Sequence, residues 1–215
     1  MKYKELYMTQ QQEQLEALQE IRSIMDRSSR FISLSGVAGI FAGISALAGA
    51  GAVLWYFNKH NLQYQNVYSS GISSEAVVFL AVVAALVFLL AVSAAIYFSA
   101  RKAQKVKQSI WHSQGQRLVL NLCIPLAVGG AFCLVLLYHD IIYLVAPAML
   151  IFYGLSLINS SKYTFRDIRY LGFCDVVLGL LACFFIQYGF VAWVLGFGVL
   201  HIIYGAVMYY KYEKS

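Results

Sequence analysis

The positively charged residues are distributed very unevenly around six long apolar runs, and this asymmetry constrains the fold more than any other feature of the sequence. The runs cover residues 31–57, 76–99, 118–137, 141–158, 171–187 and 190–210. Fifteen of the 16 Lys and Arg residues lie before the first run, after the last run, or in the second and fourth connections, and only Lys59 lies elsewhere. About 20 apolar residues span a bilayer, and short connections rich in Lys and Arg stay in the cytoplasm. The sequence therefore predicts an all-α polytopic membrane protein with six transmembrane helices, paired as three hairpins, and both termini in the cytoplasm.

Composition agrees with a membrane protein and argues against a nucleic-acid-binding one. Of the 215 residues, 60% are hydrophobic and 12% are charged, which is not the balance of a soluble globular domain. The net charge of +6 comes from residues that flank the apolar runs, where topology and anionic headgroups account for it. The first 30 residues are polar, and the first apolar run is too long for the core of a cleavable signal peptide. We expect the lipid bilayer as the main partner, and no nucleic acid.

Residues 1–30 are expected to form a separate cytoplasmic region with an amphipathic helix, ahead of a six-helix bundle at 31–215. Thr9 and Gln12 fit a capping box at the start of that helix. Its apolar stripe includes Leu18, Ile21 and Met25. The stripe fits a helix on the bilayer surface or against the protein's own loops, and it also fits a helix that binds a partner or a second copy. Because its polar face mixes acidic and basic residues, we expect a protein contact through Leu18, Ile21 and Met25.

Small residues recur along the first run at a spacing of four or eight. They are Ser35, Gly39, Gly43 and Gly51. Such a face lets two helix backbones approach closely in a membrane. It predicts helix packing, either within the bundle or in a homodimer.

The last two hairpins show a faint internal repeat at an offset of 51 residues. The matched pairs are Cys123 and Cys174, Ala131 and Ala182, Leu144 and Leu195, Ile151 and Ile202, Tyr153 and Tyr204, and Gly154 and Gly205. This pattern favours three similar hairpins around an axis along the membrane normal. Parallel repeats of that kind occur in transporters, which is an analogy of fold only.

Three polar residues at membrane depth are the candidate site. Asp175 is an acid inside an apolar run, and a carboxylate there needs a partner, either Arg166 or Arg169 in a structural salt bridge or a bound ion or substrate. His201 lies near the middle of the last run and fits a hydrogen bond between helices or a proton relay. Asn121 lies four residues before Pro125, which leaves the Asn121 carbonyl without its helical donor. Pro147 does the same to the carbonyl of Tyr143.

The sequence contains no recognisable catalytic or metal-binding motif. All four cysteines fall within apolar runs, without a C-x-x-C pair or a His at metal-ligand spacing. A phosphate-binding glycine loop, an H-E-x-x-H motif and a nucleophile elbow are also absent. We expect no cofactor, no metal and no catalytic residues, and favour a non-enzymatic role.

Residues 20–36, which run from an acidic and basic helix into a glycine-rich span, resemble the start of a group of uncharacterised small bacterial membrane proteins with six spans. The resemblance covers about the first 50 residues. It implies a multi-pass location in the bacterial inner (cytoplasmic) membrane, and it implies no activity or site.

Two functions remain open at the level of sequence. The first is an interaction, sensor or regulatory subunit of the inner membrane that acts through its cytoplasmic helix. The alternative is a transporter of a small solute or lipid that uses a polar site formed by Asp175, His201 and Asn121. A pocket containing those polar side chains would favour transport, and a dry core with an exposed apolar stripe on the arm would favour interaction.

Overall fold

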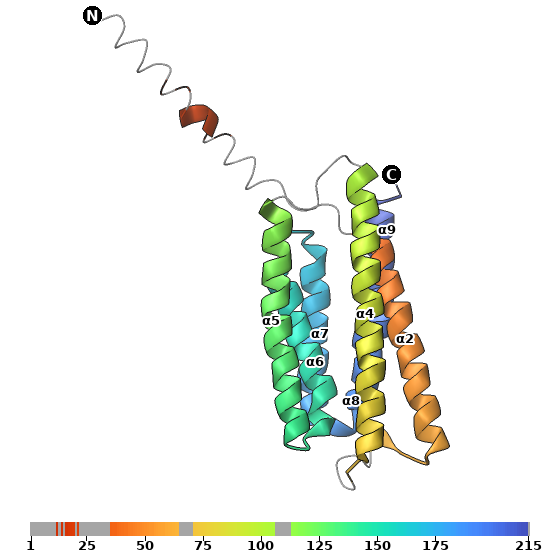
Figure 1. Cartoon of the computed structure of the whole chain (residues 1–215). Coiled ribbons are helices and arrows are strands. Elements are labelled where there is room, and N and C mark those ends of the chain that lie inside the picture. Colours follow the sequence, from red (N-terminus) through yellow and green to blue (C-terminus); the bar gives the residue numbers. More distant parts are fainter. Residues whose placement is uncertain are drawn as a thin grey trace, which may run out of the picture. The chain divides into compact units, whose positions relative to one another are not determined.

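The structure is a computed structural model that describes residues 12, 14, 16–19, 21, 35–64, 71–105 and 113–214. The chain divides into two compact units, Met1–Arg30 and Phe31–Ser215 (Figure 1). In the first unit the described residues are helical, and the side chains of Leu18 and Ile21 are 65% and 54% exposed. Met25 lies outside the described residues. The assignment of this unit as a cytoplasmic amphipathic helix stays a prediction.

The described part of the second unit is all helical, with no strand. In chain order its elements are α2 (Gly36–Lys59), α4 (Ser74–Lys105), α5 (Ser113–Tyr138), the 3-10 turn η2 (Ile142–Leu144), α6 (Val145–Ser160), α7 (Asp167–Phe184), the 3-10 turn η3 (Ile186–Tyr188), α8 (Gly189–Trp193), the π-helix η4 (Val194–Leu200) and α9 (His201–Tyr212). Asp140, between α5 and η2, has a positive φ of 59°, as a tight reversal at this position requires.

Five of the described helical stretches are long and apolar enough to cross a membrane. They are Gly36–Lys59, Ser74–Lys105, Ser113–Tyr138, Ile142–Ser160 and Ile186–Tyr212. The chain is therefore an all-helical protein with the features of an integral membrane protein. The sequence predicted six spans, and the remaining helix, α7, is not among the five. It has 18 residues, and Asp167, Arg169 and Asp175 lie within it.

The last apolar run, expected to be one span over residues 190–210, lies within the single candidate span Ile186–Tyr212. It is not a continuous α-helix, because a π-helix at Val194–Leu200 lies between two α-helical stretches. A π-turn widens a helix and changes which way the following side chains point, and such turns are frequent at functional sites. Pro147 also differs from expectation, because it lies in the first turn of α6, where a missing N–H has little effect on the helix.

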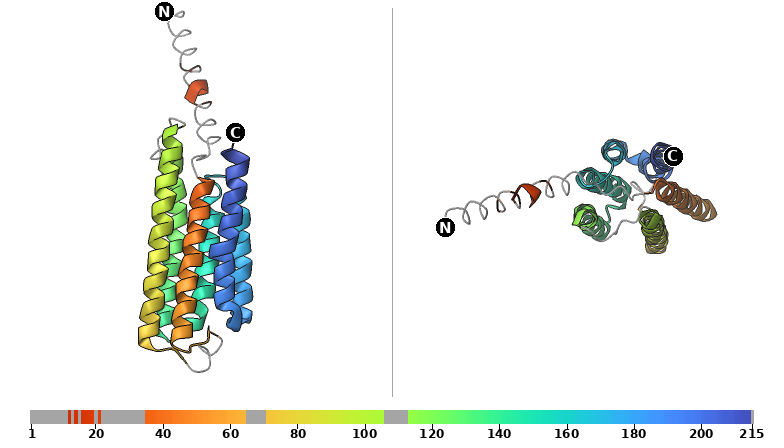
Figure 2. Two further views of the ribbon diagram at one scale, coloured as in Figure 1. Left: turned by 90° about the vertical axis from the view of Figure 1, so that its right-hand side faces the viewer. Right: turned by 90° about the horizontal axis from the view of Figure 1, so that it is seen from above.

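The helices of the second unit stand side by side as an open ring. In order of contact the ring runs α5, α6, α7, α9 with α8 and η4, α2 and α4. The view along the helices shows this order and the separation of α4 from α5 (Figure 2). Among the described elements, α4 makes an extended contact only with α2, and it buries only Ala76, Ser99 and Ala103. The ring is therefore open between α4 and α5.

Two helix–helix contacts of the ring, α6 with α7 and α9 with α2, are closed by glycines in matching positions, and we call these contacts seams. At the seam of α6 and α7, a Cβ added to Gly154 would lie 2.5 Å from the carbonyl oxygen of Gly172. At the seam of α9 and α2, a Cβ added to Gly205 would lie 2.6 Å from the carbonyl oxygen of Gly36. Gly154 and Gly205 are one of the pairs related by the offset of 51 residues. Both seams therefore rest on direct contact between helix backbones, which only glycine permits.

The same correspondence extends one turn further along both seams. A Cβ on Gly179 would lie 2.7 Å from Cγ1 of Ile151, and a Cβ on Gly43 would lie 2.6 Å from Cγ1 of Ile202. Ile151 and Ile202 are also related by the offset of 51. The third seam would join α4 and α5, but α4 contains no glycine. Its backbone cannot approach a neighbour in the way that closes the other two seams.

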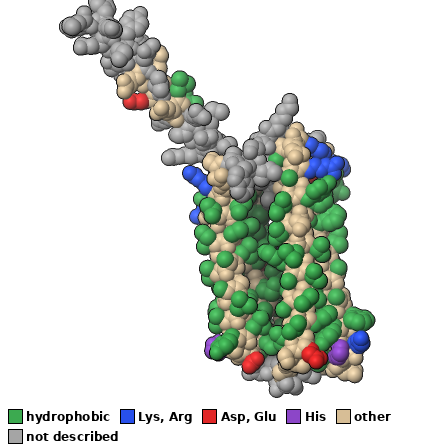
Figure 3. All heavy atoms as spheres, in the orientation of Figure 1, with side chains coloured by type: hydrophobic (Ala, Val, Ile, Leu, Met, Phe, Trp, Pro, Cys, Tyr) green, Lys and Arg blue, Asp and Glu red, His purple; other side chains and the backbone are tan. Residues whose placement is uncertain are grey.

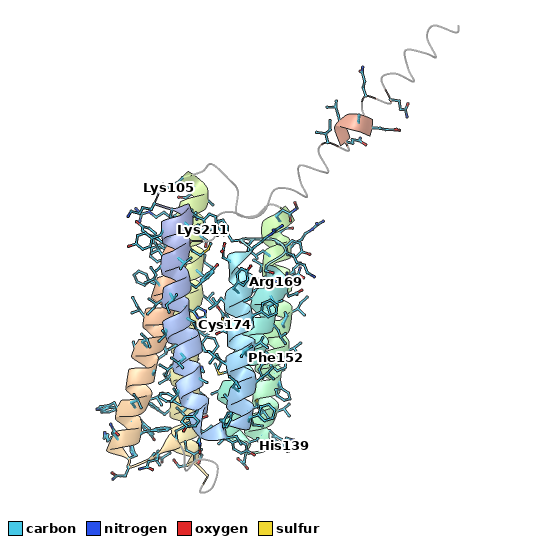
Figure 4. All side chains as sticks on the ribbon, turned by 180° about the vertical axis from the view of Figure 1, so that it is seen from behind. Lys105, His139, Phe152, Arg169, Cys174 and Lys211 are labelled. Carbon is cyan, nitrogen blue, oxygen red and sulfur yellow. The ribbon has the colours of Figure 1, made fainter. Side chains whose placement is uncertain are left out.

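At the end of the second unit where the Lys and Arg side chains gather, Glu213 joins the start of α2 to the end of α4. The backbone N–H of Gly36, at the start of α2, donates to Glu213 at 2.6 Å, and Lys102 near the end of α4 lies 3.1 Å from the same carboxylate. Figure 4 shows Lys105, Arg169 and Lys211 at this end and His139 at the other.

Candidate functional site

Asp175 is the most unusual residue of the bundle. Its side chain is 0% exposed, and neither carboxylate oxygen has a hydrogen-bond partner in the described part of the chain. The predicted salt bridge with Arg166 or Arg169 is therefore wrong. Arg169 lies six residues earlier on the same helix, roughly 240° around its axis, so the two side chains point to different faces. The Arg169 guanidinium instead lies 5.4 Å from the centre of the Phe173 ring.

The π-helix η4 faces this carboxyl group through Gly196. A Cβ added to Gly196 would lie 2.9 Å from Oδ1 of Asp175 and would collide with Leu150. Nδ1 of His201 lies 2.7 Å from the carbonyl oxygen of Gly196. Asp175 and His201 therefore meet at one glycine, the first from α7 and the second from the start of α9.

His201 has both ring nitrogens in hydrogen bonds. Because a carbonyl oxygen only accepts, Nδ1 carries the hydrogen that is donated to Gly196. Nε2 lies 2.7 Å from the hydroxyl of Tyr153. A neutral ring satisfies both contacts when the Tyr153 hydroxyl donates to Nε2, a tautomer assigned here from the hydrogen-bond network. The 5%-exposed imidazole is thus held without a need for positive charge.

Two tyrosines complete the cluster and were not among the predicted site residues. Tyr153 comes from α6, and Tyr204 on α9 packs against the same buried group of Leu157, Ile168 and Leu171 as Tyr153 does. The buried hydroxyl of Tyr204 has no hydrogen-bond partner in the described part of the chain. The offset of 51 residues pairs these tyrosines, each directly before a seam glycine. That pairing was the available signal, although apolar runs produce similar matches by chance. We call Asp175, His201, Tyr153, Tyr204 and Gly196 the polar cluster.

Asn121, the third predicted polar residue, lies elsewhere. Nδ2 of Asn159 on α6 donates to the Asn121 carbonyl oxygen at 2.9 Å and lies 3.1 Å from its Oδ1. The carbonyl that Pro125 leaves without a helical donor is therefore satisfied by a neighbouring helix. Nδ2 of Asn121 donates to the Arg117 carbonyl oxygen at 2.8 Å. Asn121 joins α5 to α6 and takes no part in the polar cluster.

An apolar cavity of about 140 Å³ lies beside the opening between α4 and α5. Its walls come from α2, α4, the end of α5, η2, α6 and α8, together with Tyr64. Asp175, His201 and Asn121 do not line it. Burial raises the pKa of Tyr64 to about 12, so this phenol is neutral at physiological pH. The space-filling view shows hydrophobic side chains on both sides of the hollow (Figure 3).

Aromatic rings connect the cavity wall to the polar cluster. Trp193 lines the cavity, and its ring centre lies 5.3 Å from that of Phe197 in the π-helix. Phe197 lies 5.1 Å from the Tyr153 ring and 5.9 Å from the His201 ring. Trp193, the last residue of α8 before the π-helix, therefore links the cavity wall to the polar cluster through Phe197.

The predicted small-residue face is divided among several contacts. Gly39 lies against Gly205 and Gly43 against Gly198, so both contribute to the seam of α2 with the last helix. The Ser35 hydroxyl donates to Glu213 at 3.3 Å, and a Cβ on Gly51 would meet nothing within 4 Å.

The described residues contain no group of three or more His, Cys, Asp or Glu side chains that could hold a metal ion, and the four cysteines are free thiols.

Comparison of the sequence with models of known protein families, with curated proteins and with solved structures found no match. The five long apolar helices themselves give the class of the protein, which is an integral membrane protein built as a helical bundle.

Proposed function

We propose that this chain is a six-span transporter of the bacterial inner membrane that couples proton binding at Asp175 to movement of a small solute. The observation that carries the proposal is a fully buried carboxyl group, without a hydrogen-bond partner in the described chain, against the π-helix η4. A buried ionisable group at membrane depth marks a functional site by default, and buried polar groups without partners require an explanation.

The carboxyl group is poised to exchange a proton. A carboxylate charge without a partner in an apolar interior costs several kcal/mol, so the group takes up a proton and becomes neutral. His201, which meets Asp175 at Gly196, has both ring nitrogens in hydrogen bonds. Release of the proton therefore requires a change in the surroundings of Asp175, as expected of a carrier that alternates between two conformations.

The contact of the π-helix with Trp193 supplies a route for coupling. Asp175 packs against Gly196, and Trp193, three residues earlier and directly before the π-helix, lines the cavity. A change in the charge of Asp175 therefore acts on the π-helix that directly follows this residue of the cavity wall. The cavity is the solute site in this proposal.

The membrane topology is part of the proposal. α7 lies between α6 and the last helix in the ring and makes the glycine seam with α6, which supports its role as a sixth span. The charge asymmetry of the sequence supports cytoplasmic termini. The likeness of residues 20–36 to the start of small bacterial inner-membrane proteins supports the location.

The test is the pH dependence of thermal unfolding in neutral-lipid nanodiscs. For the wild-type protein we expect the unfolding temperature to fall as the pH rises, because deprotonation leaves an unpartnered charge in the core. Asp175→Asn should fold and lose this dependence. Asp140→Asn, at an exposed turn, is the matched control and should keep it. A pH dependence that is the same in Asp175→Asn contradicts proton binding at this residue.

A second function, as an interaction or regulatory subunit, is favoured by one observation on the first unit. Leu18 and Ile21 are large apolar side chains that are more than half exposed. Replacement of Leu18, Ile21 and Met25 by Ser should remove a co-purifying protein or lower the oligomeric state while the bundle stays folded. Replacement of the polar Gln12, Gln14 and Gln19 by Ser is the matched control. An unchanged assembly rejects this role.

A further inference from the structure

We propose that the cavity binds an amphiphilic organic cation, in which a compact aromatic or alkyl group carries an ammonium. This inference rests on the proposed transport function, and it adds the chemical class of the solute. Three features of the described residues support it: the size and lining of the cavity, its side opening, and the charge at its outer end.

The lining selects an apolar group of about the size of a benzene ring. On α4 it is formed by one stripe at helical spacing, with Val77, Leu80, Ala81 and Ala84. A dry engineered cavity of about 150 Å³ binds benzene, and this cavity measures about 140 Å³. The Tyr64 hydroxyl is a neutral polar group in the lining, and it lies 3.5 Å from the carbonyl oxygen of Tyr143. The wall therefore offers no charge to pair with an ion inside the cavity.

The opening between α4 and α5 gives access from the bilayer. Because α4 lacks glycine and makes an extended contact only with α2, no described helix packs closely against it on this side. Exposed Leu, Val and Phe side chains cover the rest of α4. A solute that partitions into the membrane can therefore reach the cavity without crossing water.

The charge at the outer end of the opening is acidic. Glu75 lies in the first turn of α4, two residues before the lining residue Val77, and Asp140 lies two residues before the lining residue Ile142. Both carboxylates are exposed, one from each side of the opening, and neither forms an ion pair with a described residue. Two carboxylates around an apolar cavity attract a cation attached to an apolar body.

Lys59 and His60 at the end of α2, and His139 beside Asp140 (Figure 4), are basic side chains at this end. The Lys59 ammonium lies 5.0 Å from the centre of the Trp55 ring, and the His60 ring lies 4.3 Å from the Tyr56 ring. The His139 ring lies 5.2 Å from the Tyr138 ring. None of these three basic groups, all within the described chain, forms an ion pair with Glu75 or Asp140.

The cavity wall also has the aromatic character that favours an ammonium. Trp193, Phe190 and Tyr64 all line it. The faces of aromatic rings attract cations, and quaternary ammonium groups are recognised in this way. A neutral molecule of the same shape would gain the apolar contacts and lose this attraction.

The experiment compares a cation with its uncharged isostere. Benzyltrimethylammonium and neopentylbenzene have the same shape, with nitrogen replaced by carbon. Binding of each to the full chain is measured in phosphatidylcholine nanodiscs by saturation-transfer NMR, with protein-free nanodiscs as the blank. We expect tighter binding of the cation, and a roughly fivefold loss of its affinity in Glu75→Gln/Asp140→Asn, because exposed charges contribute modestly. The affinity of neopentylbenzene should not change in that variant.

A second pair of variants tests the location. Ala81 is exposed and lines the cavity, so Ala81→Trp should fill the space and abolish binding of both probes. Ala85→Trp, on the same helix and not in the lining, should bind as the wild type does. Equal affinity for the two probes in the wild type overturns the choice of a cation. Unchanged binding in Ala81→Trp overturns the site.

The outcome is separable from that of the proposed function. Binding of benzyltrimethylammonium that persists in Asp175→Asn, in a protein without pH-dependent unfolding, would retain this cation site and reject proton coupling. A normal pH response without selective cation binding would do the reverse.

Discussion

The closed and open sides of the ring differ in one property of the sequence, the presence of glycine. At the closed seams, Gly154 meets Gly172 and Gly205 meets Gly36, with each added Cβ brought to within 2.6 Å of a carbonyl oxygen. On the open side α4 has no glycine, and Gly130 on α5 has nothing within 4 Å of its Cβ position. In a membrane, helices associate through close packing, because lipid already satisfies apolar surfaces. Side chains that are equally apolar therefore give a tight seam on one side and an opening on the other.

The difference also separates the two parts of the candidate site. The polar cluster lies within the closed part of the ring, where Asp175 and His201 are buried, whereas the cavity lies beside the opening. The π-helix contacts the polar cluster, and its Phe197 contacts Trp193 in the cavity wall. In the proposed function, the closed part of the ring holds the proton site and the open side gives access to the solute site.

The largest effect is expected from converting a closed seam into an open one. Gly205→Leu places a branched side chain against the backbone of Gly36 and Ile40. We expect a loss of about 3 kcal/mol or more in the free energy of unfolding, because the neighbouring atoms are main chain and cannot move aside. Denaturant unfolding in detergent measures it. Gly130→Leu is the matched control and should be nearly neutral, and a similar loss in both variants would contradict the seam argument.

A smaller effect is expected where the closed part contacts the π-helix. Gly196→Ala brings a methyl group to 2.9 Å from Oδ1 of Asp175 and into Leu150. We expect a loss of about 2 kcal/mol from overpacking, together with a weaker pH dependence of unfolding. Thermal unfolding at several pH values reports both. If Gly196→Ala keeps the wild-type stability and pH dependence, the described contact of Gly196 with Asp175 is incorrect.

On the open side of the ring, Glu213 joins the end of α4 to the start of α2 through polar contacts, which we call the polar tie. Glu213 accepts from the N–H of Gly36 and from Lys102 on α4, and both members of the ion pair are largely buried. Glu213→Ala should lower the free energy of unfolding by about 1.5 kcal/mol, since charge-assisted hydrogen bonds to buried groups are lost. It should also increase proteolysis near α4. Lys214→Ala, at the adjacent position, is the control, and equal effects of the two changes would show that the tie is unimportant.

The smallest effect concerns an ion pair at the end of α7. Burial raises the pKa of Asp167, but hydrogen bonds from Lys211 and Tyr212 outweigh it and bring the pKa below 3.8. A carboxyl group with a lowered pKa in the folded state stabilises the protein above its unfolded pKa, and this stability is lost as the pH falls through the folded value. We expect a slight fall in the unfolding temperature below about pH 4. Asp167→Asn should reduce that fall, and an identical acid transition in the variant would exclude the contribution.

Much of the helical architecture could be predicted, because the length of each apolar run and the positions of the Lys and Arg residues beside it can be read directly from the sequence. The five candidate spans overlap the apolar runs of the sequence, and the basic ends of the helices gather as the charge asymmetry predicts. The π-helix could not be predicted, because residues 194–200 are as apolar and glycine-containing as an ordinary span. Its Gly196 lies against Leu150 and Asp175, which are distant in sequence, and the local pattern does not show such contacts. The position of Pro147 in a first turn likewise depended on where η2 ended.

The candidate site was predicted in part. Asp175 and His201 were identified as rare polar residues in apolar runs, and they meet at Gly196. Asn121 has the same polarity, but α5 directs it toward Asn159. Of the two alternatives for Asp175, the salt bridge with Arg166 or Arg169 is wrong, because nearness in sequence does not place two side chains on the same helix face. The cavity could not be predicted, since its lining residues are common apolar types brought together by five helices.

The central claim is that protonation of Asp175 is transmitted through the π-helix to the cavity, and the fluorescence of Trp193 tests it most directly. A protein with Trp55→Phe and Trp111→Phe retains Trp193 as its one tryptophan, 5.3 Å from Phe197 and in the cavity wall. We predict that its emission shifts with pH in nanodiscs, and that the shift disappears when Asp175→Asn is added but persists with Asp140→Asn. A Trp193 emission that does not change with pH, or a shift that is the same in the presence of Asp175→Asn, would contradict the account.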